Sequence, residues 1–296
     1  MIYSLIGHYS LIFGLIIGLT LFYLSFKNFK SSTVLDNKII LFTFSQFFLV
    51  VISFLCLIFS FIISDFSNET VFNNSHTTKP LFYKISGTWG NHEGSLLLWL
   101  LVLTLFILIF LLRTKKQPTK YIILTLVFQQ IIIVGFFIFL IKTSNPFNYL
   151  FPIPEEGLGL NPILQDPALA IHPPILYLGY VGSSIIFSSV LAATSLKMIS
   201  TTWAVHIKNW ILISWIFLTL GILLGSIWAY YELGWGGFWF WDPVENVSLM
   251  PWLALTTLLH CILVLERKSI LTSWVIILSI ATFTLSMCGT FLVRSG

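Results

Sequence analysis

Residues 95–112 read SLLLWLLVLTLFILIFLL, an apolar run without a single charged side chain. Coiled as an α-helix, which rises 1.5 Å per residue, the run measures about 27 Å, close to the thickness of the hydrocarbon layer of a membrane. A backbone inside that layer can satisfy its N–H and C=O groups only with its own partners, and a helix does so completely. The run therefore predicts a transmembrane helix.

The rest of the chain has the same character. Of its 296 residues, 57% are hydrophobic and only 9% are charged, and the mean hydropathy is +0.95. These values exclude a soluble domain. Apolar runs of spanning length recur, so we expect an all-α polytopic helix bundle that forms a single integral membrane domain over residues 1–296. The eight predicted spans are 5–26, 39–64, 95–112, 121–141, 175–196, 209–230, 250–265 and 271–293.

The distribution of basic residues predicts the orientation of the bundle. Eleven Lys and Arg residues fall in the loops on one side, against four on the other, so the first side is expected to face the cytoplasm or matrix. Both termini and the loops 65–94, 142–174 and 231–249 then face outward. The net charge of +4 is small and sits in short loops, which indicates no nucleic-acid partner. The eleven are Lys27, Lys30, Lys38, Arg113, Lys115, Lys116, Lys120, Lys197, Lys208, Arg267 and Lys268.

The outward loop 231–249 contains the stretch GWGGFWFWD, from Gly234 to Asp242. Aromatic rings at this density, beside glycines that let a ligand approach the backbone, favour binding of a large, flat, hydrophobic molecule such as a porphyrin. The alternative, an interfacial aromatic belt, scatters tryptophans over several helix ends instead of placing them in one run. The predicted binding residues are Trp235, Gly236, Gly237, Phe238, Trp239, Trp241 and Asp242.

The residues that follow the aromatic run predict the start of a helix. Asp242 can cap the helix, Pro243 suits its first position, and Glu245 stands at the third, as in a capping box. This local role explains both carboxylates better than acid–base catalysis does.

His260 lies in the seventh predicted span, about 15 Å along the helix from Met250 and thus near the centre of the bilayer. An ionisable residue at that depth needs a partner that offsets its desolvation. Neutral imidazole is a common haem ligand, and the aromatic run favours that interpretation. The alternative is a histidine hydrogen-bonded to a neighbouring helix.

His172 stands in the outward segment DPALAIHPP, residues 166–174. Asp166 can cap a short helix whose first residue is Pro167. We expect Pro173 and Pro174 to end that helix, because a proline disfavours α conformation in the residue before it. The segment would then hold His172 rigidly at the outer surface, a placement that suits a ligand. A plain interfacial histidine is the alternative.

The segment GTWGNHEGS, residues 87–95, predicts a tight re-entrant turn before the third span. For His92 and Glu93 local hydrogen bonding is favoured over metal ligation, because one His–Glu pair is too small a ligand set. Cys56, Cys261 and Cys288 lie in apolar spans without metal-binding spacing, which indicates no disulfide or redox role.

These motifs together resemble the CcmF family, the cytochrome c-type biogenesis haem lyases of the haem-handling superfamily. The resemblance extends from about residue 70 to the end of the chain, and the aromatic run matches the family's WWD signature. The motifs that carry it are WGNHEGSLLLW at 89–99, LNPILQDP at 160–167 running into HPP at 172–174, the segment from Trp235 to Trp252, and GTFLVRSG at 289–296.

The resemblance implies a cytochrome c haem lyase. This enzyme forms thioether bonds between haem vinyl groups and the cysteines of apocytochrome c, usually in a C-x-x-C-H site, with haem supplied by a haem chaperone. It further implies that His172 binds the iron of substrate haem at the WWD loop. His260 would bind the iron of a b-type haem in the membrane, which reduces the incoming haem. No residue of the chain is a convincing general acid, so the catalytic residues stay unknown.

The sequence departs from the family pattern in one respect. A second outward histidine and a second transmembrane histidine, which the family pattern places later, are not in the sequence. The resemblance therefore implies the N-terminal part of a split family member, with a separate C-terminal CcmF-like subunit that supplies the missing ligands and is required for catalysis.

Two other functions and two locations fit parts of the sequence. A non-catalytic haem transporter is disfavoured by the additional N-terminal spans and the 89–99 motif. A respiratory-complex subunit should carry Lys or Glu at mid-span, and none stands there.

The abundance of Phe and the long Ile/Leu tracts favour the mitochondrial inner membrane, with the WWD loop in the intermembrane space. The alternative is a bacterial plasma membrane with a periplasmic loop.

Overall fold

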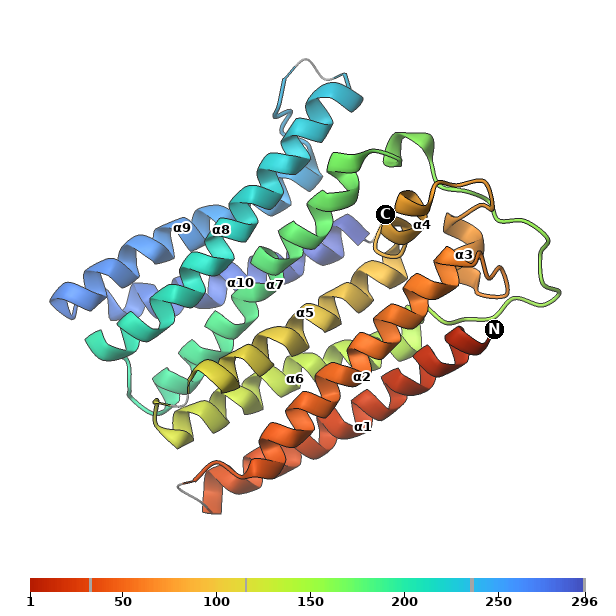
Figure 1. Ribbon diagram of the computed structural model, residues 1–296. Helices are drawn as coiled ribbons and strands as arrows, with labels where there is room; N and C mark the ends of the chain where they lie inside the picture. The colour runs from red at the N-terminus through yellow and green to blue at the C-terminus, as the bar shows by residue number, and fades with distance from the viewer. Residues whose placement is uncertain (32–33, 115, 235–236, 295–296) are drawn as a thin grey trace. The chain divides into compact units, whose positions relative to one another are not determined.

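The computed structural model describes residues 1–31, 34–114, 116–234 and 237–294 (Figure 1). This part of the chain forms ten α-helices and one 3₁₀ turn, with no β-strand beyond an isolated bridge between Asn68 and Tyr149. The helices are α1 (Ile2–Ser31), α2 (Asn37–Ile62), α3 (Glu69–Asn74), α4 (Leu81–Gly87), α5 (His92–Arg113), α6 (Thr119–Thr143), α7 (Pro167–Ser195), α8 (Thr201–Glu232), α9 (Pro243–Lys268) and α10 (Thr272–Arg294).

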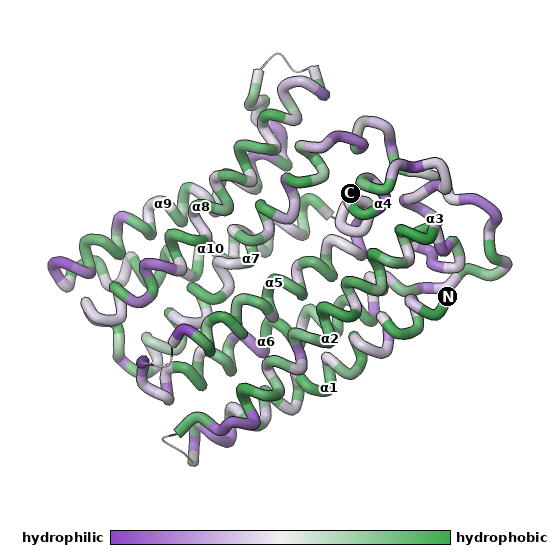
Figure 2. The backbone as a smooth tube through the Cα atoms, viewed as in Figure 1, coloured by the Kyte–Doolittle hydropathy of each residue, from purple (hydrophilic) through white to green (hydrophobic). Residues whose placement is uncertain are grey.

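Eight of the described helices, all except the short α3 and α4, are long and apolar enough to cross a membrane. Figure 2 shows the hydrophobic residues along these helices and the hydrophilic ones gathered mainly at their ends. The predicted all-α class and the number of spans are confirmed. Consecutive spans are expected to cross a membrane in opposite directions, which predicts one common side for the start of α1 and the segments before α5, α7 and α9. That this side faces outward stays a prediction.

Several helices extend beyond the predicted spans. The segments 197–208 and 266–270 were expected as loops, but α8 begins at Thr201 and α9 continues to Lys268. Lys and Arg are good helix formers, and their long side chains can reach water while the backbone stays helical. Lys208 and Glu266 accordingly form an ion pair between α8 and α9, with Nζ 2.7 Å from Oε2.

The chain divides into two compact units, each of which is described separately. The first contains residues 1–24, 36–108 and 130–173, and the second contains 25–35, 109–129 and 174–296. Helices α1, α5, α6 and α7 contribute to both. The first unit buries Trp99 of α5, which stacks on Phe136 of α6 at 5.1 Å between ring centroids. It also contains a buried amide pair, in which Gln130 Nε2 donates to Gln46 Oε1 at 2.9 Å.

In the second unit, glycines bring helix backbones into close contact. A β-carbon at Gly221 of α8 would lie 2.5 Å from Leu176 Cα of α7. Gly179 of α7 lies in the same way against the backbone of Leu218 in α8. Small residues at such crossings let membrane helices approach closely, where dispersion forces and hydrogen bonds hold them together.

Candidate functional site

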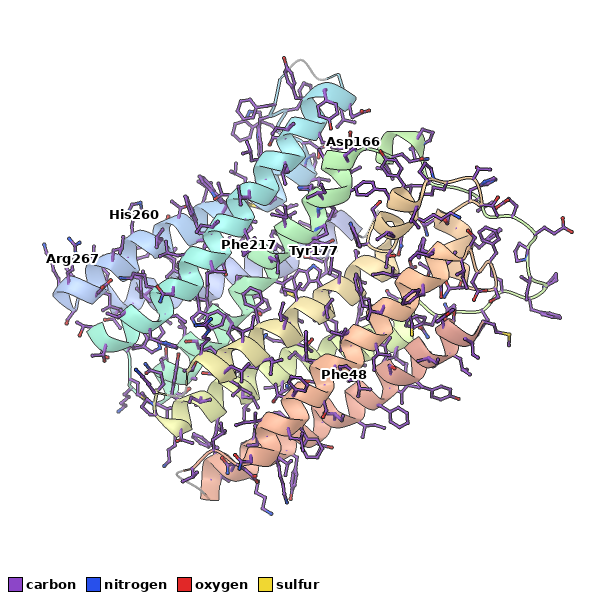
Figure 3. The ribbon with its side chains drawn as sticks, in the orientation of Figure 1. Phe48, Asp166, Tyr177, Phe217, His260 and Arg267 are labelled. Atoms are coloured by element: carbon purple, nitrogen blue, oxygen red, sulfur yellow. The ribbon has the colours of Figure 1, made fainter. Side chains whose placement is uncertain are left out.

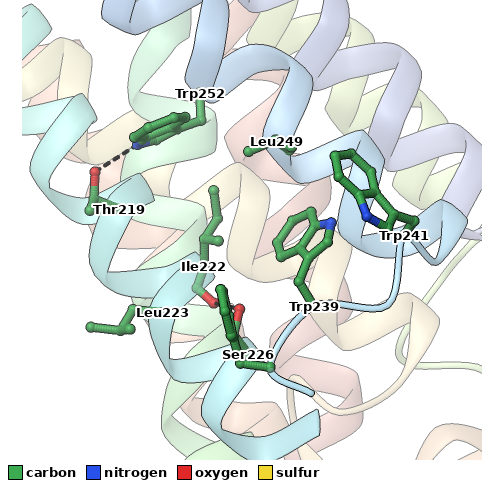
Figure 4. Close-up of a pocket in the computed structure, with 9 residues that line it drawn as sticks. Thr219, Ile222, Leu223, Ser226, Trp239, Trp241, Leu249 and Trp252 are labelled. Carbon is green, nitrogen blue, oxygen red and sulfur yellow. Dashed lines mark hydrogen bonds between the residues drawn. The ribbon is translucent and has the colours of Figure 1, made fainter. Parts of the chain in front are cut away.

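A pocket of about 470 Å³ lies where the aromatic run joins α8 to α9 (Figure 4). One wall comes from α8, another from the start of α9, and the described part of the run contributes three aromatic side chains. The lining residues are Thr219, Ile222, Leu223, Ser226, Phe238, Trp239, Trp241, Leu249 and Trp252. The pocket is thus almost entirely apolar and within the size range of ligand sites in proteins.

Hydrogen bonds to Glu245 close the loop that precedes α9. Glu245 Oε2 accepts from the backbone N–H of Phe240 at 2.9 Å and of Asp242 at 3.2 Å. Asp242 Oδ1 accepts from Val244 N at 2.8 Å. The predicted capping box is therefore confirmed, and it engages both carboxylates in backbone hydrogen bonds. Trp241 adopts φ +61, a left-handed conformation that is uncommon outside glycine and marks a constrained position.

The described rings of the run do not form one flat platform. Trp239 and Trp241 lie 6.2 Å apart at an interplanar angle of 83°. Edge-to-face contact places the positive edge of one ring against the negative face of the other, and aromatic pairs prefer it to face-to-face stacking. Trp241 is 71% exposed and Phe238 67%, so both can contact a ligand. Trp235 and Gly236, also predicted as binding residues, lie outside the described residues, and Gly237 precedes the lining aromatics.

Two tryptophans and two threonines connect α8 and α9 at the base of the pocket. Trp252 Nε1 donates to Thr219 Oγ1, and Trp215 Nε1 donates to Thr256 Oγ1, each at 2.8 Å. The two indoles stack at 6.4 Å. Sequence reasoning missed the α8 wall because α8 is apolar on all sides, so no periodicity identifies its pocket-facing residues.

One buried polar atom among the pocket-lining residues lacks a hydrogen-bond partner in the described part of the chain. Trp239 Nε1 is buried and has no hydrogen-bond partner among the described residues. A buried N–H group without a partner carries a desolvation cost, so this donor is available to a polar edge of a bound molecule.

His260 lies further along α9, about 12 Å from Trp252 by helical rise. The buried residues of α9 follow a stripe that includes Leu258 and Ile262, and His260 points away from it and is exposed (Figure 3). No hydrogen bond to its imidazole occurs among the described residues, so the alternative of a bond to a neighbouring helix finds no support in them.

His172 lies in the second turn of α7, half-buried, within the first compact unit, whereas the pocket belongs to the second. The predicted cap is confirmed, since Asp166 Oδ1 accepts from Leu169 N at 2.9 Å. The expectation that Pro173 and Pro174 end this helix is wrong, because α7 continues without a break to Ser195. The carbonyl of Ala170, which Pro174 cannot bond, accepts instead from Trp89 Nε1 at 2.9 Å.

The predicted tight turn before α5 is also present. Asn91 Nδ2 donates to the carbonyl of Gly87 at 2.7 Å, and its Oδ1 accepts from Gly94 N at 2.7 Å. Any β-carbon on Gly94 would collide with the carbonyl of Thr88, which explains this glycine. His92 Nε2 hydrogen-bonds Ser144 Oγ at 3.0 Å, so the imidazole has a hydrogen-bond partner, but one that lies 52 positions away and not in the local turn that was expected. The described residues contain no group of three or more His, Cys, Asp or Glu that could hold a metal ion, and the three cysteines are free thiols.

Eight candidate spans and an apolar, tryptophan-lined pocket beside two of them define a polytopic membrane protein with a candidate binding site. The sequence family described as cytochrome C assembly protein matches residues 89–296. The chain belongs to this family.

Relatives and a solved structure agree. The chain is 55% identical over 250 residues to the cytochrome c-type biogenesis protein CycK of Rhizobium meliloti, covering 84% of this chain and 37% of that protein. It is 46% identical over 257 residues to the cytochrome c-type biogenesis protein CcmF of Escherichia coli, covering 86% and 40%. A solved structure of the cytochrome c heme lyase CcmF superposes with a TM-score of 0.87 at 32% identity, covering 99% of this chain and 47% of that one. The chain thus spans less than half the length of these relatives.

Proposed function

We propose that this chain is the haem-binding part of a cytochrome c haem lyase and acts in cytochrome c maturation. It would bind haem at the WWD loop and support its thioether attachment to apocytochrome c. The observation that carries the proposal is the apolar pocket between α8, α9 and the aromatic run, in a chain of the cytochrome c assembly family.

The residues present fit a porphyrin. Lining side chains of Trp239, Trp241 and Trp252 offer ring faces and edges to a planar apolar molecule, and Ile222 and Leu223 add aliphatic contacts. The buried Trp239 Nε1 suits the carboxylate of a propionate, because an N–H bond to a charged acceptor is among the stronger hydrogen bonds. Bound haem would supply the vinyl groups and a redox-active iron. The chain's own groups would bind and orient the ring and exclude water from it.

Two histidines would bind iron. His172 would bind the iron of substrate haem on the outward side. His260 would bind that of a b-type haem in the membrane, since its exposed imidazole on α9 has no described partner. A bis-histidine haem needs two axial ligands, so each site requires a second imidazole. We propose that a separate C-terminal CcmF-like subunit donates both. A stoichiometric bis-histidine haem in this chain purified alone would refute that part of the proposal.

The sharpest test replaces His260 with Ala in the intact complex and records the haem spectrum of gently isolated membranes. We expect the b-type haem signal to be lost. The matched control is Leu263→Ala, a partly exposed residue of the same helix, which should leave the signal in place. A retained b-type spectrum in His260→Ala would remove the assignment.

The second candidate is a non-catalytic haem transporter or presenting subunit. One observation favours it: Asp242 and Glu245, the carboxylates next to the pocket, are both engaged in capping α9, so no described pocket group serves as a general acid. Thioether formation by a complex reconstituted from this chain, its companion, haem and an apocytochrome with a C-x-x-C-H site would decide for the lyase.

The chain is a multi-pass membrane protein, and we propose that a haem chaperone and apocytochrome c approach its outward side. Composition favours the mitochondrial inner membrane, whereas the relatives named above that carry an organism are bacterial and fit a plasma membrane with a periplasmic loop. Fractionation of the native cell, with the chain detected by antibody, separates the two locations.

A further inference from the structure

Two helices of the proposed site continue through a proline that removes a backbone donor. In an α-helix the N–H of each residue bonds the carbonyl four residues earlier, and proline has no N–H. Pro174 therefore leaves the carbonyl of Ala170 in α7 without its helical partner. Trp89 Nε1 donates to that carbonyl at 2.9 Å, so an indole N–H replaces the missing amide.

The replacement donor is itself held in place. The Trp89 ring stacks on Phe54 of α2 at 6.4 Å and 17°. Its backbone belongs to the turn between α4 and α5 that Asn91 closes with three hydrogen bonds. The bond thus connects the first turns of α7, two residues before His172, to a fixed point of the first unit.

The same arrangement occurs independently in the second unit. Pro251 in α9 leaves the carbonyl of Val247 without its helical partner, and Tyr180 of α7 donates to it through its hydroxyl at 2.9 Å. Both groups are buried. Gly289 of α10 leaves room for this hydroxyl, since a β-carbon there would collide with it.

We propose that Trp89 and Tyr180 are positioning residues for the two haem-binding segments. Trp89 fixes the start of α7, which carries His172. Tyr180 fixes the start of α9, which follows the aromatic run and contributes Leu249 and Trp252 to the pocket. The connection to haem rests on the proposed function, but the hydrogen bonds do not.

The first experiment needs no haem. Trp89→Phe keeps a ring against Phe54 and removes the donor, so Ala170 is left with a carbonyl that lacks a partner. We expect hydrogen exchange of the segment 167–180, measured in the solubilised complex, to become about tenfold faster, as the loss of one buried hydrogen bond predicts. Adding Pro174→Ala supplies an amide to the same carbonyl and should restore slow exchange.

The matched control is Pro173→Ala in the Trp89→Phe background. This change also removes a proline from α7, but its new amide faces the carbonyl of Leu169, so it should not restore slow exchange. The proposal is overturned if Trp89→Phe leaves exchange unchanged, or if Pro173→Ala rescues as well as Pro174→Ala does.

The second experiment measures haem binding by the proposed ligand His172. The difference between the haem spectra of wild type and His172→Ala defines the His172-dependent signal. Trp89→Phe should reduce this signal, and Trp89→Phe with Pro174→Ala should recover it. If the spectra of wild type and His172→Ala are the same, the proposed function of His172 fails. The exchange measurement then still decides whether Trp89 positions the start of α7. If wild type gives the signal and Trp89→Phe leaves it unchanged, the positioning role of Trp89 is overturned.

The corresponding test for α9 compares Tyr180→Phe with the double variant Tyr180→Phe and Pro251→Ala. The measured quantity is the hydrogen-exchange rate of the segment 243–256. Faster exchange in Tyr180→Phe that Pro251→Ala reverses supports the role of Tyr180. Unchanged exchange in Tyr180→Phe, or exchange that stays fast after Pro251→Ala, overturns that role.

Discussion

Glu245 shows how a single side chain shapes the candidate site. One carboxylate oxygen accepts from two backbone N–H groups of the aromatic run, at Phe240 and Asp242, and completes the cap of α9. Residues 237–242, the described part of the run before α9, contain no helix or strand that would fix it. Its conformation next to the pocket therefore depends on this acceptor.

We predict that Glu245→Ala opens the loop, whereas Glu245→Gln retains most of its order. Alanine leaves both N–H groups without their acceptor, at a cost of about 1–3 kcal/mol, while the amide oxygen of glutamine can still accept from both. Chymotrypsin cleavage after the aromatic residues of 237–242 should become roughly tenfold faster in Glu245→Ala. Glu232→Ala, an exposed residue at the end of α8, serves as control, and equal cleavage of wild type and Glu245→Ala would contradict the prediction.

Lys79 is an unusual buried cation in the segment between α3 and α4. It is only 7% exposed, and its Nζ donates to the carbonyl of Asn74 at 3.1 Å. Burial, with a smaller contribution from the charge of Lys84, lowers the pKa of Lys79 from 10.5 to about 8. The folded state therefore releases this proton before the unfolded state does.

This difference gives the pH dependence a definite sign. Below about pH 8 Lys79 is charged in both states, and the cost of burying the charge is fully present. Between about pH 8 and 10.5 the unfolded state binds more protons, so stability rises by up to about 1.4 kcal/mol per pH unit. Unfolding measured by proteolysis at pH 7 and 9.5 should show a smaller gain in Lys79→Met than in wild type. The exposed Lys142→Met should keep the gain, and equal gains in all three proteins would exclude Lys79 as its source.

At the scale of helices, close backbone contact decides how α7 and α8 pack. Gly179 and Gly221 each stand against the backbone of the opposite helix, so neither position has room for a β-carbon. Because α7 and α8 contribute Tyr180 and the pocket wall respectively, their spacing bears on the candidate site.

We predict that Gly221→Ala destabilises the second unit by about 1–3 kcal/mol, since the added methyl group forces the two backbones apart. Gly135→Ala on α6 is the control, because a β-carbon there meets nothing within 4 Å. It should be neutral or stabilising by up to about 1 kcal/mol, the difference in helix propensity. Thermal unfolding in detergent measures both, and a Gly221→Ala protein as stable as wild type would show that α7 and α8 can separate freely.

At this scale, the sequence could predict a structural feature only where the residues that form it are close together in the chain. The caps at Asp166 and Asp242 were predictable because every participating residue lies within a few positions. The continuation of α7 through Pro173 and Pro174 was not, because the replacement donor Trp89 stands 81 positions away from Ala170. The edge-to-face geometry of Trp239 and Trp241 also depends on loop closure, which composition does not reveal.

At the scale of the whole chain, the alternation of the eight spans predicts one common side of the membrane for the polar segments before α5, α7 and α9, whereas His260 lies within a span. An even number of spans separates the starts of α5, α7 and α9, so we expect His92, His172 and the aromatic run on the same side of the membrane. The basic residues concentrate on the other face, as at Lys116 and Lys197. A charge bias of this kind sets orientation in membranes, so we predict that these segments face the outer side.

Cysteine labelling tests this orientation in the intact membrane. The native cysteines are first replaced by alanine, and single cysteines are introduced at exposed positions: Glu155→Cys between α6 and α7, Lys116→Cys between α5 and α6, and Ser269→Cys after α9. A membrane-impermeant maleimide applied from the outer side should label only Glu155→Cys, and permeabilisation should make the other two reactive. Labelling of Lys116→Cys and Ser269→Cys but not Glu155→Cys would invert the orientation and place the aromatic run on the inner side, out of reach of an external apocytochrome. Labelling of only one of the two inner positions would instead contradict the number of spans between them, because Lys116 and Ser269 are separated by α6, α7, α8 and α9, an even number of crossings.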